Sequence, residues 1–168
     1  EIRLSLVGSE MCIRDSSWFG KYVIDLYNDG IINGTSATTY APNNTLTWAA
    51  ALKLLLVSNG DLKAADATGA DWSKNAIAKA AELGLVAADL DGAKAISRLE
   101  FCQVAAKLNK LAESKTESKF TDCTDGYVMA LVDAKVISGM TETTFEPAAS
   151  LTRAQIAKIL YQLTLIEK

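Results

Sequence analysis

The strongest constraint on the fold of this chain is an internal repeat. A shift of 105 residues superimposes residues 22–49 on residues 127–154 without a gap. A middle copy matches the first at a shift of 54 residues. The loop of the middle copy is four residues shorter than that of the first, so the shift beyond the loop is 50 residues. The pairs matched by the longer shift include Tyr22 with Tyr127, Ile32 with Ile137, Gly34 with Gly139 and Pro42 with Pro147. Repeats of this length indicate stacked units that bury their apolar faces against one another.

The repeat divides the chain into three units at residues 17–60, 71–112 and 120–168, which polar linkers join into one module. Residues 1–16 have no counterpart in these units and resemble a translated sequencing-adapter artefact. We therefore treat them as an extraneous segment, with a genuine N-terminal strand or arm as the alternative. On this interpretation the module is fused to an N-terminal region that is missing here.

Two segments of each unit have the apolar spacing of an amphipathic helix. In two units we expect the first segment to end at a glycine, Gly30 or Gly84, because glycine enters the left-handed conformation without penalty. The third unit has Lys135 at this position. The second segment begins behind a hydroxyl side chain that can accept a hydrogen bond from the helix N-terminus. These N-cap residues are Thr47, Ser97 and Thr152, and Glu100 and Gln155 complete a capping box in the last two units.

The two segments of each unit predict an all-α fold. A single helix pair cannot cover its own apolar stripe, so we expect three helix–loop–helix repeats to close around a shared axis. The loops of the first and third units place an aromatic residue, Tyr40 or Phe145, two positions before a proline. Because the residue before proline favours an extended path, we expect this ring to order the loop as a buried plug.

Composition narrows the possible functions. Histidine is absent, which removes the commonest general base and transition-metal ligand, so we expect no catalytic residue, metal or cofactor. Cys12, Cys102 and Cys123 lack the spacing of a zinc site, and we expect the last two to pack as small apolar side chains. Residues 89–92 match only part of a calcium loop. The net charge of −3 with scattered lysines does not favour nucleic acid, and no apolar run is long enough for membrane insertion.

Short motifs at the start of the second helices are the most specific feature of the chain. They read ISRLE at 96–100 and LTRAQ at 151–155, whereas the first unit departs with LTWAA at 46–50. A second motif, GIING, occupies 30–34 and recurs in degraded form as KVISG at 135–139. With these motifs, residues 17–168 resemble the S-layer homology domain family.

The resemblance implies a pseudo-threefold module in which the three second helices form a central bundle and the first helices and loops lie outside. It also implies a non-catalytic binding module with a secondary cell wall polysaccharide as partner, often one that bears a pyruvate ketal. The expected location is extracellular, at the cell wall or S-layer surface, where the module anchors a larger protein. The alternative is a helical structural or protein-interaction domain without a glycan ligand.

Arginine usage independently indicates an anion site. Outside the excluded segment the chain has only Arg98 and Arg153, which occupy the same position of two repeats. An arginine at a helix N-terminus opposes the helix dipole, so a carboxylate ligand held by the guanidinium and the helix amides would offset the cost. The alternative is that each arginine bridges to an acidic residue of a neighbouring repeat.

Several neighbours of these arginines complete the predicted ligand-binding set. Ser97 and Thr152 flank the two arginines, and Trp48 replaces the arginine in the first unit, where packing or stacking can explain it. Two tryptophans precede the first helices and either stack on a sugar ring or pack at a repeat boundary. Two glycines either let a ligand approach the backbone or serve a turn that requires positive φ. These residues are Trp18, Trp72, Gly34 and Gly139.

Overall fold

The structure is a computed structural model that describes residues 17–36 and 39–166, so the extraneous segment predicted at 1–16 lies outside the described residues. The predicted all-α fold is confirmed, with three isolated β-bridges but no strand among the described residues. Six helices follow one another along this part of the chain. They are α1 (Gly20–Asn28), α2 (Trp48–Asn59), α3 (Trp72–Glu82), α4 (Arg98–Leu108), α5 (Gly126–Asp133) and α6 (Arg153–Thr164).

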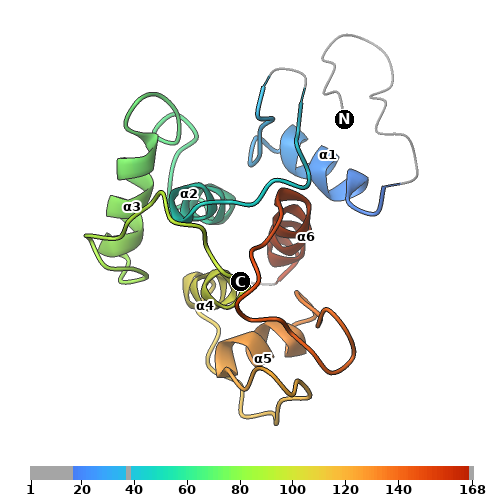
Figure 1. Cartoon of the computed structure of the whole chain (residues 1–168). Helices are drawn as coiled ribbons and strands as arrows, with labels where there is room; N and C mark the ends of the chain where they lie inside the picture. Colours follow the sequence, from blue (N-terminus) through green and yellow to red (C-terminus); the bar gives the residue numbers. More distant parts are fainter. Residues whose placement is uncertain (1–16, 37–38, 167–168) are drawn as a thin grey trace.

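The second helices of the three units lie at the centre and the first helices lie outside them. In Figure 1 α2, α4 and α6 are seen nearly end-on around the middle of the molecule, with α1, α3 and α5 at the periphery. Within the centre, α2 packs against both α4 and α6. The helical arrangement therefore agrees with the predicted closure of three repeats around one axis.

Each outer helix packs against the central helix of a different unit. The contacting pairs are α2 with α3, α4 with α5, and α6 with α1, so every unit covers the apolar stripe of the unit before it. The last of these pairs joins the first and third units and closes the ring (Figure 1). The core is consequently shared: one continuous cluster of buried side chains includes Leu26, Leu55, Phe101, Leu131 and Leu160.

The helix ends follow the predicted capping signals. Thr47, Ser97 and Thr152 have extended backbone and accept a hydrogen bond from the third amide of their helices, and the two capping boxes are present. Gly30 and Gly84 adopt the left-handed conformation just after α1 and α3. Lys135 takes the same conformation after α5, with φ of 59°, although a side chain makes that conformation unfavourable.

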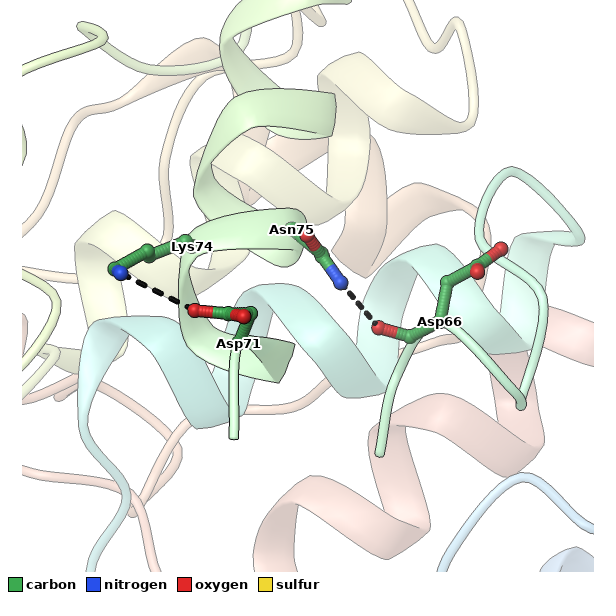
Figure 2. Close-up of polar contacts among 4 residues, drawn as sticks. All are labelled: Asp66, Asp71, Lys74 and Asn75. Atoms are coloured by element: carbon green, nitrogen blue, oxygen red, sulfur yellow. Dashed lines mark hydrogen bonds and ion pairs between the residues drawn. The ribbon is translucent and has the colours of Figure 1, made fainter. Parts of the chain in front are cut away.

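The linker between the first two units is packed onto the fold. Leu62 and Ala67 are buried, so this segment contributes to the core. Figure 2 shows that Asn75 of α3 donates a hydrogen bond to the backbone carbonyl of Asp66 at 3.0 Å, while Lys74 pairs with Asp71 at 3.1 Å. A hydrogen bond thus ties the linker to the first turn of α3.

Candidate functional site

The loop of each unit docks on the N-terminus of another unit's central helix. The first two amides of α4 donate to the carbonyls of Ala149 and Pro147 in the third unit, at 2.8 and 3.0 Å. The first two amides of α6 donate in the same way to Asn44 and Pro42, and those of α2 donate to residues 94 and 92. The predicted use of these amides by a carboxylate ligand is therefore wrong, because the docked loops already accept their hydrogen bonds.

Arg153 is held by the loop of the first unit. Its Nε donates to the carbonyl of Tyr40 at 2.8 Å and one terminal nitrogen donates to the carbonyl of Asn33 at 2.6 Å. The guanidinium lies over the Tyr40 ring, 4.6 Å from the ring centroid. Carbonyl oxygens and a π-face thus offset the unfavourable position of this cation at a helix N-terminus.

Arg98 has the equivalent surroundings in the loop of the third unit. One terminal nitrogen donates to the carbonyl of Ser138 at 2.8 Å, and the guanidinium lies 4.7 Å from the centroid of the Phe145 ring. Arg98 is only 6% exposed, and its buried Nε has no hydrogen-bond partner among the described residues. Burial lowers the pKa of Arg98, whereas Cys102 and Glu146 act in the opposite direction. The alternative prediction was that each arginine bridges to an acidic residue of a neighbouring unit. Both arginines do contact a neighbouring unit, but their partners are backbone carbonyls and aromatic rings.

Arg98 also lines a cavity of about 290 Å³ between α4, α6 and the loop of the third unit. Lys158 of α6 adds a second cation, and the side chain of Gln155 lies 4.0 Å from the sulfur of Met140, another wall residue. Trp18, which is 58% exposed, supplies an indole ring from the first unit. All three units therefore contribute to one site that offers two positive charges, an amide and an aromatic face.

The repeat register predicts a second groove of the same kind at Arg153. Lys53 stands where the first cavity has Lys158, Trp72 where it has Trp18, and Gly34 where it has Gly139. The ammonium of Lys53 lies 5.2 Å from a ring centroid of Trp72. Burial lowers the pKa of Lys53, and the positive charge of Arg153 lowers it further, which places the two cations within electrostatic reach. One difference is Ala50, which replaces Gln155.

The third groove lacks this chemistry. Trp48 replaces the arginine and is buried in the shared core. Gln103 replaces the lysine and donates to Asp125 at 2.7 Å, while Glu100 adds an acidic group and Cys123 replaces the tryptophan. The positions at Arg98 and Arg153 therefore each pair an arginine with a lysine, whereas the equivalent position at Trp48 has neither cation.

The remaining predicted site residues have structural roles that the geometry defines. The hydroxyls of Ser97 and Thr152 accept from the amides of Glu100 and Gln155. Gly139 does not have positive φ; a Cβ there would lie 2.5 Å from the Phe120 ring and 2.3 Å from the carbonyl oxygen of Thr141. Close packing, rather than a turn with positive φ, therefore requires this glycine.

Three further predictions concern the cysteines, the partial calcium motif and metal ligands. Cys102 and Cys123 are both buried, as expected of small apolar side chains. In the partial calcium motif, the Asp91 carboxylate accepts from the amide of Ala93 at 3.0 Å, which is a local turn. No group of three or more potential metal ligands occurs within the described part of the chain.

Lys158, Lys53 and Met140 were not predicted as site residues. The repeat itself contained the signal for the lysines, because the 105-residue shift superimposes Lys53 on Lys158. Met140 had no such signal, since its counterpart in the first unit is Thr35.

Comparison with known proteins agrees with the repeat analysis. The profile of the S-layer homology domain matches residues 13–52 and 121–157, which cover the first helix, the loop and the start of the second helix in the first and third units. The chain carries S-layer homology domains. The first match begins four residues before the boundary that we placed at residue 17, and the middle unit lies outside both matches. An S-layer homology domain is a cell-surface anchoring module, and domains of this family bind cell wall polymers.

Three curated relatives align with 90% of this chain. They are an endoglucanase of Bacillus sp. strain KSM-635 at 27% identity, an amylopullulanase of Thermoanaerobacterium thermosulfurigenes at 26% and the exoglucanase XynX of Acetivibrio thermocellus at 27%. The alignments cover 18%, 9% and 16% of those proteins. The chain therefore spans less than a fifth of the length of each relative. No helix in the described part of this S-layer homology module has the length and apolarity to cross a membrane.

Proposed function

We propose that this S-layer homology module anchors a larger protein to the cell envelope by binding an anionic secondary cell wall polysaccharide. The supporting observation is the 290 Å³ cavity in which Arg98 and Lys158 lie beside an exposed tryptophan. A sugar ring that carries a carboxylate, such as a pyruvate ketal, matches this combination. Its apolar face can stack on Trp18 while the carboxylate faces the two cations.

The partly buried position of the cavity cations favours a carboxylate ligand over a neutral glycan. Charge-assisted hydrogen bonds are stronger than neutral ones, and a cation withdrawn from water gains more from an anionic partner than a fully hydrated cation does. The neighbouring Gln155 offers its side-chain NH2 group as a donor to sugar hydroxyls, because its Oε1 already accepts from the amide of Thr152. We therefore propose that the ketal carboxylate, rather than the hydroxyl groups, determines affinity.

Lys158 provides the sharpest test, because its side chain lines the cavity and belongs to neither the docked loop nor a helix cap. We expect Lys158→Met to weaken binding of a ketal-bearing oligosaccharide about tenfold, measured by calorimetry. Lys63→Met removes the same charge from an exposed site in the first linker and is the matched control. Equal affinity of the Lys158 variant and the wild type would exclude this cavity as the anion site.

A second measurement distinguishes glycan binding from the alternative of a protein-interaction domain. The wild type should bind purified polysaccharide, and chemical removal of the ketal groups should abolish most of that binding. Rising salt should weaken the wild type more than the Lys158→Met variant, because screening acts only where the charge contributes. Retention that is independent of both ketal groups and salt would favour the alternative.

We also propose that the module is the anchor of a longer chain, as its length relative to the three glycoside-degrading relatives suggests. Fusion of residues 17–168 to a fluorescent protein tests the anchoring function directly. The fusion should remain with washed cell wall fragments, whereas a fusion that combines Lys158→Met with Lys53→Met should wash off.

A further inference from the structure

The loop that holds Arg98 is itself held by a carboxylate that no predicted role explains. Asp122 accepts hydrogen bonds from the amides of Phe145 and Glu146, both at 2.8 Å. These two hydrogen bonds hold the pKa of Asp122 below its ordinary value. The carboxylate thus binds the backbone of Phe145, the residue whose ring lies against the Arg98 guanidinium.

The rest of the segment 120–122 braces the same loop. The Phe120 ring contacts the Phe145 ring, with 5.6 Å between centroids, and it fills the space that a side chain at Gly139 would need. Thr121 adds two hydrogen bonds to the carbonyl of Thr143, from its amide at 2.9 Å and from its hydroxyl at 3.2 Å. Segment 120–122 therefore contacts the parts of the loop that bind Arg98, which are the Ser138 carbonyl next to Gly139 and the Phe145 ring.

The loop needs such a restraint because its backbone is strained. Glu146 has φ of 60°, in the left-handed region that disfavours side chains other than glycine. A segment in this conformation persists only where surrounding contacts impose it. The Asp122 carboxylate binds the amide of that same residue, so it acts at the strained position.

The first unit has the same strain without the same restraint. Ala41, the counterpart of Glu146, has φ of 51°, yet the position that corresponds to Asp122 is Ser17. A serine hydroxyl cannot supply a charged acceptor to two amides. The support of the two loops therefore differs at this position, which is an aspartate in the third unit and a serine in the first.

We propose that Asp122 is a positioning residue for the Arg98 groove: its carboxylate fixes the backbone of Phe145 and Glu146 and so orients Arg98 toward the cavity. The loop at Arg153 lacks this residue and is joined to Arg153 by the Tyr40 hydroxyl instead. The effect on ligand affinity rests on the proposed polysaccharide-binding function, whereas the effect on Arg98 does not.

Nuclear magnetic resonance of the isotope-labelled chain tests the positioning without any ligand. In Asp122→Asn, amide hydrogen exchange at Phe145 and Glu146 should become about three to ten times faster. The Arg98 Nε–H resonance should move toward that of a free arginine, because the ring current of Phe145 is lost. Glu142→Gln, which removes an exposed charge from the same loop, should change neither signal, and Asp122→Glu should restore part of both.

The same variants then test whether positioning affects binding. In an Arg153→Ala background, Asp122→Asn should weaken binding of a ketal-bearing disaccharide about three- to tenfold. Unchanged Arg98 resonances, or changed resonances with unchanged affinity, would overturn the proposal. If the wild type does not bind the disaccharide, the proposed function fails for this probe and the resonances alone decide the positioning. Asp122→Ser, which copies the first unit, replaces the asparagine variant if that protein does not fold.

Discussion

Tyr40 and Arg153 hold each other through three contacts although 113 residues separate them. Arg153 Nε donates to the backbone carbonyl of Tyr40 at 2.8 Å, and the Tyr40 hydroxyl donates to the backbone carbonyl of Arg153 at 3.0 Å. The guanidinium also lies over the tyrosine ring. Because Tyr40 belongs to the first unit and Arg153 to the third, this pair helps to close the ring of repeats.

Alkaline pH should weaken this closure. Burial raises the pKa of Tyr40 to about 12, although the positive charge of Arg153 lowers it in part. The neutral phenol therefore contributes stability that is complete below the ordinary pKa of 10.0 and is lost as pH rises through about 12. Thermal melts over this range should show a fall in the melting temperature.

Tyr40→Phe separates this effect from general alkaline denaturation. Phenylalanine occupies the equivalent position 145, so the ring should pack without strain. We expect a loss of about 1 kcal/mol for the missing hydrogen bond at neutral pH and a weaker dependence on pH above 10.0. An unchanged alkaline response would assign the effect to another group.

Arg98→Ala should destabilise the module as well as weaken ligand binding. The substitution removes the hydrogen bond to Ser138 and the contact with the Phe145 ring, which together contribute about 1 to 2 kcal/mol. Arg98→Lys keeps the charge but loses the planar donor geometry, so the stability of this variant should lie between those of the wild type and Arg98→Ala. Chemical denaturation measures these differences, and wild-type stability of the alanine variant would show that the loop docks without the arginine.

Lys135→Gly should stabilise the protein. Lys135 has φ of 59°, whereas the equivalent residues of the other units are the glycines at 30 and 84. The relief of left-handed strain exceeds the entropy that glycine adds to the unfolded chain, so we expect a gain of about 0.5 to 1 kcal/mol. Lys115→Gly in the exposed second linker is the control, since no comparable backbone strain exists there. A destabilised Lys135 variant would contradict this account.

The three units should not fold separately. Since α1 packs against α6 and α2 against α3, a fragment of residues 17–60 contains neither contacting pair. Circular dichroism of this fragment should show a largely unfolded chain, because so short a chain seldom buries enough surface alone. By contrast, a circular permutant that joins residue 166 to residue 17 through a flexible linker and opens within 113–119 keeps every pair and should fold. A cooperative transition in the fragment would refute shared closure.

Local features of the chain were predictable because they depend on residues near one another in sequence. The helix stripes, the N-caps at Thr47, Ser97 and Thr152 and the left-handed glycines after α1 and α3 all follow from spacing and side-chain chemistry. The repeat added one long-range conclusion, closure around an axis, since equal units with uncovered stripes must cover each other. The positions of Arg98 and Arg153 at helix N-termini were therefore also evident.

What those arginines bind within the protein was decided by the tertiary structure alone. Repetition shows that units are equivalent but not which unit each one contacts, so the docking of the third unit's loop on α4 could not be inferred. In that docking, the first amides of α4 donate to backbone carbonyls of the loop, and the Phe145 ring lies against the Arg98 guanidinium. The cavity arises from the same cause, because it brings together Trp18, Arg98 and Lys158 from three units. Spacing and side-chain chemistry are enough to define the repeated unit and its helices, whereas the site depends on the order in which the units cover one another.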